Sequence, residues 1–527
     1  MSPAKKNPGR SVVSASRSRA PTPAMEAMTH HSWWMVVAAC AIVYAGALGC
    51  GFAFDDHLMI EGNRVVQAGT LRDIFGGEYW GTIAPGAQSH GYRPVTILTL
   101  RANHALSGLA PWSYHAMNVL LHALVSLAVL SVARRLGLPE RAALAAALLF
   151  AVHALHTEAV TAIAGRAELL AALGVLAGLL VHDRGRPYLA TGLFALGLLS
   201  KENAIVFPAL ALAWDVVRRR ELRWTAYAAY GGVVVGFFAL RLAVTGHAMP
   251  TFAVLPLDNP LASVSVGQRL LSATAVLGRY AILLVAPIRL SADYALGALP
   301  ILRTPFNPHF MLGFLVIAGA TAGAVALWRR RPDLSFALAA LVLGFAPVSN
   351  VVIPIHTMMG ERLAYLPSVG FCLLVAAVLR PGRAFRAALA IVLLGHAGRT
   401  YVRNADWKDD ATLFSAAFRV TPGSARVANN YGNVLKLRGD VDGALVQFHR
   451  AAAIYPDYTD AYRNEYLTLV GLGRPREAAR AAADGARALL RLGYPREALA
   501  AAADARRLDP QINLRDVEAR AGALLGR

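Results

Sequence analysis

Long apolar runs alternate with short polar connections over the first 400 residues of the chain. The first run covers about residues 33–54, close to the ~20 residues that a helix needs to cross a lipid bilayer. Basic clusters such as Arg134-Arg135 and residues 218–220 join the later runs. We predict an all-α polytopic membrane protein with about eleven spans, at about residues 33–54, 114–133, 141–157, 168–182, 187–200, 203–217, 224–244, 309–328, 334–350, 363–379 and 384–400.

The segment 264–290 decides on which side of the membrane the later connections lie. It is apolar enough to cross a bilayer, but it contains Arg269 and Arg279. If it crosses, the basic connections near residues 329–331 and 380–386 face outward, against the positive-inside rule. We therefore prefer an interfacial or re-entrant segment. This choice puts the N-terminal arm in the cytoplasm and the C-terminal tail outside.

Beyond residue 405 the pattern changes to charged, Ala- and Arg-rich helices with a period of 34 residues. Pro422 and Pro456 show this period, and so do Gly439 and Gly473. Small residues where paired helices meet are typical of tetratricopeptide (TPR) repeats, which form concave binding surfaces. A generic Ala-rich helical bundle is the alternative. We favour a C-terminal TPR α-solenoid.

These patterns divide the chain into three parts. Residues 1–31 form a basic, Ser- and Pro-rich arm that we expect to be disordered. Residues 32–404 form the membrane domain, and residues 405–527 form the repeat domain. Within the membrane domain, the segments 55–113 and 246–308 are too long for simple connections, so we expect functional segments on the outer face.

Composition and charge narrow the class of protein further. The 527 residues are 56% hydrophobic and only 16% charged, whereas soluble proteins have about 25% charged residues. The net charge of +20 comes largely from the arm and the short connections, which fits topology signals at anionic lipid and predicts no nucleic-acid partner. Cys40, Cys50 and Cys372 lie in apolar runs, so we expect core residues and no disulfide framework.

Ionisable residues gather on the expected outer face of the membrane domain. Such groups cost free energy at the membrane edge unless they are paired or line a wet cavity, which makes them functional candidates. The cytoplasmic connections carry only simple basic runs. The outer candidates are Asp55, Asp56, Arg93, His115, His153, His156, Glu158, Arg166, Glu168, Lys201, Glu202, Glu361 and Arg362.

The adjacent acids Asp55 and Asp56 follow the first apolar run directly. One carboxylate can remove the proton of an attacking hydroxyl group, and the other can hold the geometry. Because like charges repel, the pKa of one of the two acids should be raised. A solvated pair that caps a loop helix is the alternative.

Four basic residues from separate segments suit a phosphate group, since Arg binds phosphate bidentately and a departing phosphate needs neutralisation. They are Arg93, Arg166, Lys201 and Arg362. Snorkelling to lipid headgroups is the alternative. His153, His156 and Glu158 resemble a metal site only loosely, because the glutamate does not share the helix face of the histidines. We predict no metal-ligand set and no soluble cofactor, and dependence on a divalent metal stays open.

Several short motifs, in a fixed order before the repeats, make the chain resemble the transmembrane-and-TPR-containing protein O-mannosyltransferases of the GT-C glycosyltransferase superfamily. The motifs are Phe54-Asp55-Asp56, Tyr92-Arg93-Pro94, His153-Ala-Leu-His156-Thr-Glu158, Ser200-Lys201-Glu202-Asn203, Ser291-Ala-Asp293-Tyr294 and Glu361-Arg362-Leu-Ala-Tyr365. The resemblance implies transfer of a hexose, expected to be mannose, from a polyprenyl-phosphate sugar to Ser or Thr hydroxyls of proteins on the outer or lumenal face. It implies one Asp of the pair as the base, and we favour Asp55, which lies nearer the membrane.

The resemblance also implies a donor site that includes Arg166, Lys201 and Arg362, with His153 and His156 nearby. The expected partners are membrane lipid, the lipid-linked sugar and a protein bound by the repeats. The Ala- and Arg-rich composition indicates a bacterial inner-membrane protein with periplasmic repeats, or an ER protein if the chain is eukaryotic. A glycolipid or envelope glycan as acceptor, and a non-enzymatic TPR membrane scaffold, are the alternatives.

Overall fold

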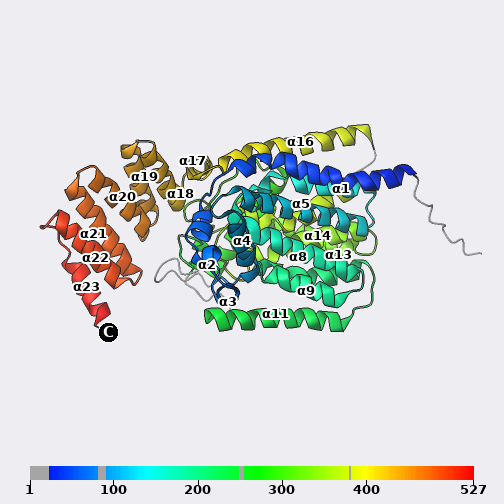
Figure 1. Cartoon of the computed structure of the whole chain (residues 1–527), viewed down its shortest axis with the longest axis horizontal. Helices are drawn as coiled ribbons and strands as arrows, with labels where there is room; N and C mark the ends of the chain where they lie inside the picture. The colour runs from blue at the N-terminus through cyan, green and yellow to red at the C-terminus, as the bar shows by residue number, and fades with distance from the viewer. Residues whose placement is uncertain (1–22, 81–90, 248–253, 379–381, 527) are drawn as a thin grey trace, which may run out of the picture.

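The computed structural model of the chain describes residues 23–80, 91–247, 254–378 and 382–526. Every regular element among them is a helix, which confirms the predicted all-α class for this part of the chain. A long helical bundle forms one part of the molecule, and a narrower helical tail forms the other part (Figure 1). The tail therefore projects from one end of the bundle.

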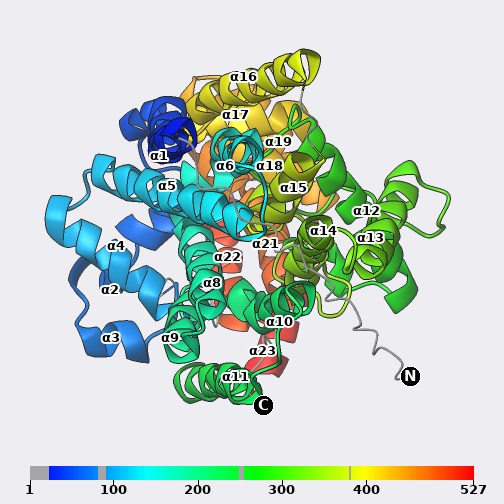
Figure 2. The ribbon, with the colours of Figure 1, turned by 90° about the vertical axis from the view of Figure 1, so that its right-hand side faces the viewer.

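The bundle is built from helices that lie side by side along the long axis of the molecule (Figures 1 and 2). Among the neighbours in contact are α5 with α6 and α8, α8 with α9, α6 with α15, and α14 with α15. The helices are α1 (Pro23–Val43), α5 (Trp112–Arg135), α6 (Glu140–Val152), α8 (Arg166–Asp183), α9 (Pro187–Leu198), α10 (Phe207–Val217), α11 (Trp224–Thr245), α13 (Pro308–Leu327), α14 (Pro332–Phe345), α15 (Pro367–Ala377) and α16 (Arg383–Asp406).

Five described helices are long and apolar enough to cross a membrane, or six if the bent pair Glu140–Val152 and Ala154–Val160 is one span. Four shorter apolar helices accompany them. The five helices are Trp112–Arg135, Ile163–Asp183, Trp224–Thr245, Val266–Val285 and Pro308–Leu327. Length and composition thus indicate a multi-pass protein, but they do not establish the predicted count of eleven spans.

The helix α12 (Val266–Val285) meets the length criterion for a span, although we predicted an interfacial segment there. It packs along α13. Gly278 packs against the first turn of α13, where a Cβ atom would lie 1.9 Å from the carbonyl oxygen of His309. The hydroxyl of Tyr280 donates to the carbonyl of Gly360 at 2.8 Å. These contacts pack α12 against α13 and against the segment near Gly360.

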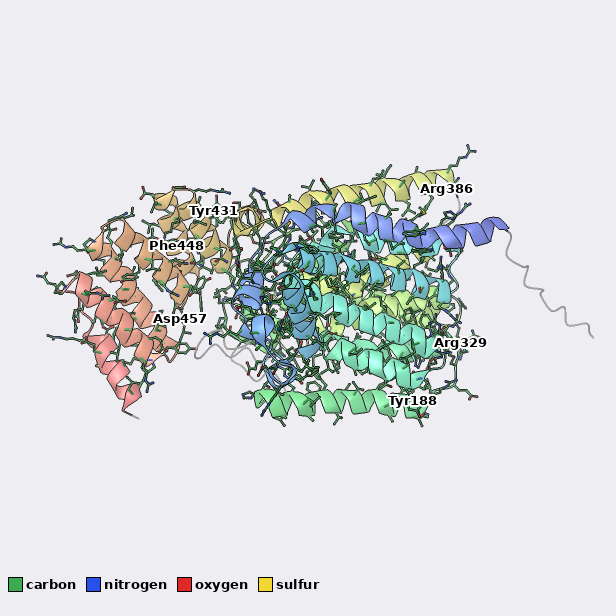
Figure 3. All side chains as sticks on the ribbon, viewed as in Figure 1. Tyr188, Arg329, Arg386, Tyr431, Phe448 and Asp457 are labelled. Atoms are coloured by element: carbon green, nitrogen blue, oxygen red, sulfur yellow. The ribbon has the colours of Figure 1, made fainter. Side chains whose placement is uncertain are left out.

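The basic connections lie at the end of the bundle away from the tail. Figure 3 shows Arg329 and Arg386 there. Arg219 Nη2 donates to the carbonyl of Arg329 at 3.1 Å, so two predicted cytoplasmic connections meet. The helix α1 begins at Pro23, within the arm that we expected to be disordered up to residue 31, and proline is favoured at the first position of a helix. Residues 1–22 lie outside the described part.

Between α1 and α5, a small helical layer covers the tail end of the bundle. Its elements are η2 (His57–Glu61), α2 (Arg64–Ala68), α3 (Leu71–Gly76) and α4 (Pro94–Ser107). Asn63 caps α2, and Thr70 and Asp73 form a capping box at α3, which satisfies the first free amides of these short helices. Met59 and Ile60 of η2 and Leu100 of α4 are fully buried in the core of this layer.

The tail is a row of helices in which each one packs against the next. Gly432 lies where α18 meets α19, and a Cβ atom there would lie 2.6 Å from the ring of Phe448. Gly439 and Gly473, one predicted period apart, end helices with φ of +84° and +66°, which glycine adopts without strain. The helices are α17 (Asp410–Val420), α18 (Ala425–Leu437), α19 (Val441–Ile454), α20 (Thr459–Gly471), α21 (Pro475–Arg491), α22 (Pro495–Leu508) and α23 (Arg515–Leu525).

Candidate functional site

The adjacent acids Asp55 and Asp56 lie where the chain leaves the first helical segment, at the tail end of the bundle. Phe54, just before them, has a φ of +54°, a left-handed conformation that is unusual for an aromatic residue. Its backbone N–H donates to Asp410 Oδ1 of the tail at 2.8 Å, and its ring meets Phe414 edge-on. The tail therefore helps to hold the turn that sets the direction of the two acids.

The carboxylate of Asp56 is turned into the protein and is 1% exposed. Its Oδ1 accepts from the backbone N–H of Ala164 at 2.8 Å, and its Oδ2 accepts from that of Ala53 at 3.4 Å. Burial raises the pKa of Asp56 to about 7, although the hydrogen bond from Ala164 opposes the shift. Asp56 thus braces the turn before α8 and has no free path to a substrate hydroxyl.

Asp55 meets a different environment. Its side chain is 26% exposed, and its ion pair with Arg362 is long, with 3.9 Å between Oδ2 and Nη2. No hydrogen bond to its carboxylate is found among the described residues. Burial raises the pKa of Asp55, while the positive charges of Arg362 and Arg426 lower it. Asp55 is therefore the acid that can reach an incoming group.

Arg362 comes from the short helix η8 (Glu361–Ala364) and joins Asp55 to a buried carboxylate. Its backbone N–H donates to Glu158 Oε2 at 2.9 Å, and its Nη1 pairs with Glu158 Oε1. Glu158 lies on α7 (Thr157–Val160) and is 1% exposed. The guanidinium is held on one side, so its 28% exposed side chain can still face a ligand.

Two more cation–carboxylate pairs extend this charged cluster. The ammonium of Lys201 pairs with Glu168, which also accepts from Asn203 Nδ2 at 2.6 Å. Arg93 pairs with Glu202 at 2.9 Å, and its guanidinium lies 4.6 Å from the ring centre of Tyr79. Glu202 also faces Arg241 at 3.8 Å.

These pairs influence one another. Burial lowers the pKa of Lys201, Glu168 raises it, and the charges of Arg93 and Arg362 lower it further. The structure thus brings together six predicted residues with Asp55: Arg93, Glu158, Glu168, Lys201, Glu202 and Arg362.

Arg166 does not belong to this open cluster. It is fully buried, and three of its nitrogens are already used: Nε donates to Asn118 at 2.8 Å, Nη1 to Asn103 at 2.5 Å, and Nη2 to the carbonyl of Tyr114 at 2.9 Å. These bonds join α4, α5 and α8. We therefore leave Arg166 out of the donor site and regard it as a structural group.

The predicted histidines are also core residues. His115 is fully buried, with Nε2 3.3 Å from the carbonyl of Gly51. His156 contacts the carbonyl of Phe150 and the hydroxyl of Ser368, and His153 contacts the carbonyl of Leu284. Within the described ranges, no group of three His, Cys, Asp or Glu side chains could hold a metal ion.

Glu361 stands next to Arg362 but points into the interior. It is fully buried, and one of its oxygens accepts from the backbone N–H of Ser291 at 2.5 Å and from the hydroxyl of Tyr294 at 2.9 Å. Its other oxygen lies 3.9 Å from Arg403 Nη2. Burial raises the pKa of Glu361 to about 8 despite the charge of Arg403. Glu361 therefore holds the loop at Ser291 rather than a substrate.

The sequence reasoning missed three charged residues beside Asp55. Arg426 of α18 pairs with Asp293 at 2.9 Å and with Asp258. Ser424 Oγ donates to Asp293 at 3.1 Å. Asp293 belongs to a motif quoted above, so it could have been included in the site. Arg426 and Asp258 offered no signal, because they lie outside the motifs and far apart in the chain.

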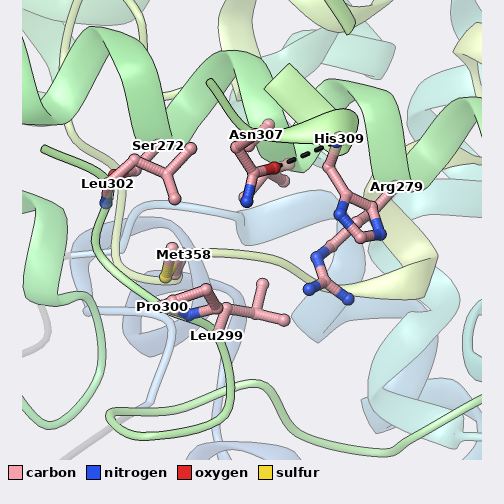
Figure 4. A pocket seen from close by; sticks show the side chains of 10 residues that line it. Ser272, Arg279, Leu299, Pro300, Leu302, Asn307, His309 and Met358 are labelled. Atoms are coloured by element: carbon pink, nitrogen blue, oxygen red, sulfur yellow. Dashed lines mark hydrogen bonds between the residues drawn. The ribbon is translucent and has the colours of Figure 1, made fainter. Parts of the chain in front are cut away.

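A shallow pocket lies away from this cluster, between α12 and the start of α13 (Figure 4). Ser272, Arg279, His309 and Met358 are among its lining residues. Asn307 also lines it, but its side chain caps α13 by accepting from the backbone N–H of His309 at 2.9 Å. None of the residues paired around Asp55 lines this pocket.

Comparison with known proteins matches both the membrane domain and most of the chain. The family model for glycosyltransferase family 87 matches residues 92–354. The protein O-mannosyl-transferase TMTC3 of Mus musculus is 33% identical over 491 residues, covering 84% of this chain and 53% of its own length. The chain is homologous to the TMTC protein O-mannosyl-transferases. The human TMTC3 protein is 32% identical with the same coverage, and protein O-mannosyl-transferase F38B6.6 of Caenorhabditis elegans is 30% identical, with 80% and 63% covered.

This similarity confirms the resemblance to protein O-mannosyltransferases that the sequence motifs predict. The chain spans about half of the length of the mouse and human TMTC3 proteins. A solved structure, the APC/C hetero-tetramer Cut9-Hcn1, aligns with 87% of the chain and 91% of its own at 13% identity, but the TM-score of 0.19 carries no evidence of a shared fold.

Proposed function

We propose that this TMTC homologue is a membrane glycosyltransferase that transfers mannose from a polyprenyl-phosphate sugar to Ser or Thr hydroxyls of proteins on the outer face. The observation that carries the proposal is the position of Asp55, which is partly exposed beside Arg362 while its neighbour Asp56 is locked by backbone amides. The names of the homologues support mannose and a protein acceptor. The family 87 match supports the reaction class.

In the proposed reaction, the Asp55 carboxylate takes the proton of the acceptor hydroxyl as the oxygen attacks the anomeric carbon. A new C–O bond forms, and the bond between the sugar and the phosphate oxygen breaks with inversion. The departing polyprenyl phosphate keeps the electron pair. Its negative charge grows in the transition state, so cations that are already in place lower the barrier.

Arg362, Lys201 and Arg93 supply these cations in our proposal. Each is paired with a carboxylate, and Glu158 and Glu168 are 1% exposed. Such pairing keeps a charged side chain stable in a region of low dielectric and fixes its position before the donor arrives. Arg362 would act closest to the reacting atoms, since it contacts the base itself.

The experiment compares Asp55→Asn with Asp56→Asn in cells that lack the native chain. Intact masses and Ser/Thr peptides of exported proteins report the added hexoses. We expect Asp55→Asn to remove the hexoses, because the amide cannot accept the proton. We expect Asp56→Asn to keep part of the activity, because an amide oxygen can still accept from Ala164.

Full modification in the Asp55→Asn cells would end the proposal. Hexose that depends on the chain but appears on lipid or envelope glycan, and not on Ser/Thr peptides, would overturn the protein acceptor and keep the transferase.

A further inference from the structure

The first two tail helices, α17 and α18, meet the loop that carries Asp55 and the segments that face it. On one side, Asp410 of α17 accepts from the backbone N–H of Phe54 at 2.8 Å and lies 3.3 Å from His57 Nε2. On the other side, Arg426 of α18 pairs with Asp293 and Asp258 from the segment between α11 and α13. The Asp55 site is thus framed by the tail as well as by the bundle.

The loop from Ser291 to Gly297 connects the tail to the bundle. Toward the tail, the carbonyl of Leu296 accepts from the backbone N–H of Ala425 at 2.9 Å, and the hydroxyls of Ser291 and Thr421 lie 2.7 Å apart. Toward the bundle, Ser291 and Tyr294 bind Glu361, the neighbour of Arg362. A movement of the first tail helices would therefore be transmitted to Asp293 in this loop and, through Glu361, to Arg362. Both residues act on Asp55.

Close packing makes this contact rigid. Gly297 has a φ of +87°, and a Cβ atom on it would lie 2.2 Å from the carbonyl oxygen of Gly423. Any side chain at this position would push the tail away from the loop. Ser424 and Arg426, which both contact Asp293, lie one and three positions after Gly423.

Charge gives Arg426 a role beyond holding the tail in place. Asp55, Asp258 and Asp293 gather near one another, and the last two raise the pKa of Asp55. Arg426 pairs with both and adds a positive charge that acts on Asp55. Its side chain is only 23% exposed, so solvent screens these effects less than at an open surface.

We infer that Arg426 is a positioning residue of the Asp55 site, and that the first two tail helices complete the catalytic unit of this transferase. The inference rests on the proposed function. The carrying observation is one guanidinium from the tail that pairs with two carboxylates, and the charges of all three groups act on the base. On this basis the tail is part of the active site as well as a surface for partners.

The test uses the full chain in lipid nanodiscs with undecaprenyl-phosphate mannose as the donor and a Ser/Thr peptide as the acceptor. We expect Arg426→Ala to lower kcat by about 10- to 100-fold with a smaller change in KM, since small displacements of a catalytic group cost this much. Arg438→Ala is the matched control: Arg438 ends the same helix, is exposed, and should leave kcat unchanged.

The pH profile separates positioning from simple loss of structure. Asp55 is faced by Arg362 from η8, Arg426 from α18, Asp258 and Asp293 from the loops, Glu158 from α7, Tyr79, and its neighbour Asp56. Removing the Arg426 charge raises the pKa of Asp55, so the acid limb of the kcat profile should move to higher pH. Arg426→Lys keeps the charge and should keep the limb near its original position.

A variant that lacks Arg426 and both of its carboxylate partners tests the same point from the other direction. In Arg426→Gln with Asp258→Asn and Asp293→Asn, the carboxylates that Arg426 neutralises are gone. The acid limb should return toward that of the unmodified chain. A purely structural role predicts that Arg426→Ala lowers activity at every pH without moving the acid limb. It also predicts that the acid limb of the triple variant does not differ from that of Arg426→Ala. That result would overturn the inference.

The outcome also distinguishes this inference from the proposed function. If the unmodified chain consumes no donor, the proposed function fails and the inference fails with it. If the unmodified chain is active, Asp55→Asn is inactive and Arg426→Ala matches the Arg438→Ala control in kcat and pH profile, the inference alone fails.

Discussion

Asp55 and Asp56 are adjacent in the chain, but the backbone separates their roles. Asp56 accepts hydrogen bonds from Ala164 and Ala53, whereas Asp55 forms one long ion pair with Arg362 and accepts no hydrogen bond among the described residues. A carboxylate that satisfies backbone amides is costly to move, because the amides would be left buried and unpaired. The motif could therefore indicate a catalytic pair, and the structure provides the reason to choose the first acid over the second.

The raised pKa of Asp56 predicts a pH-dependent stability. Its pKa is about 7 in the folded chain, against an ordinary value of 3.8, so the folded state holds the proton more tightly. The contribution of protonated Asp56 to the free energy of unfolding is fully present below pH 3.8 and is lost as the pH rises through about 7. Asp56→Asn stays neutral, so relative to this variant the unmodified chain should lose up to about 4 kcal/mol over this range.

Thermal unfolding of the two chains in the same detergent between pH 4 and pH 8 measures this difference. The control is Asp73→Asn, on an exposed capping residue whose pKa is lowered by the hydrogen bonds from Thr70. Parallel curves for Asp56→Asn and the unmodified chain would contradict the prediction.

At the scale of elements, helix length explains what the sequence pattern could and could not predict. The helices α5, α11 and α13 have the length and apolar character of spans, and their positions match the predicted ones. The helices α9, α14 and α15 are shorter than a bilayer requires on its own, and α16 carries Arg399 and Arg403. A hydropathy pattern cannot tell whether such helices cross, because neighbouring helices can bury their polar groups.

The space around two glycines of the tail predicts the effect of replacing each of them with alanine. A methyl group on Gly432 would lie 2.6 Å from the Phe448 ring, so Gly432→Ala should separate α18 from α19 and cost about 1–3 kcal/mol. Gly471, near the end of α20, has open space around it, and Gly471→Ala should be neutral or stabilise by up to about 1 kcal/mol.

Hydrogen exchange of the intact chain, read by mass spectrometry, measures these effects helix by helix. Faster exchange in α18 and α19 for Gly432→Ala, and not for Gly471→Ala, is the expected result. Equal exchange in both variants would show that the ring of Phe448 moves aside without cost.

At the scale of the whole molecule, the sequence could identify most residues of the site but not how they pair. Motifs such as Ser200-Lys201-Glu202-Asn203 indicated polar groups that are hard to explain within an apolar domain. They could not show which cation meets which carboxylate, because Glu158 and Arg362 are 204 positions apart. They also indicated Arg166 as a donor-site residue. Its bonds to Asn103 and Asn118, which hold it in the core, depend on the packing of three helices. Pairing over such distances is a property of the fold.

The position of the basic connections at one end of the bundle leads to a prediction about the orientation of the molecule in the membrane. Arg219 and Arg329 meet at the end of the bundle away from the tail, and Figure 3 shows Arg386 at that end too. Since basic connections are retained in the cytoplasm, this end should face inward and the tail outward. We expect Arg330→Cys to be protected from a membrane-impermeant maleimide in intact cells, and Arg438→Cys to react.

The three native cysteines are buried, which keeps the background of this labelling low. Permeabilised cells provide the control, because Arg330→Cys should then react as fast as Arg438→Cys. Labelling of Arg330→Cys in intact cells would place a basic connection outside and reverse the expected topology. Asp55 lies at the tail end of the bundle, so that result would also move the proposed reaction to the cytoplasmic face. The orientation of the whole molecule therefore decides which acceptors the site can meet.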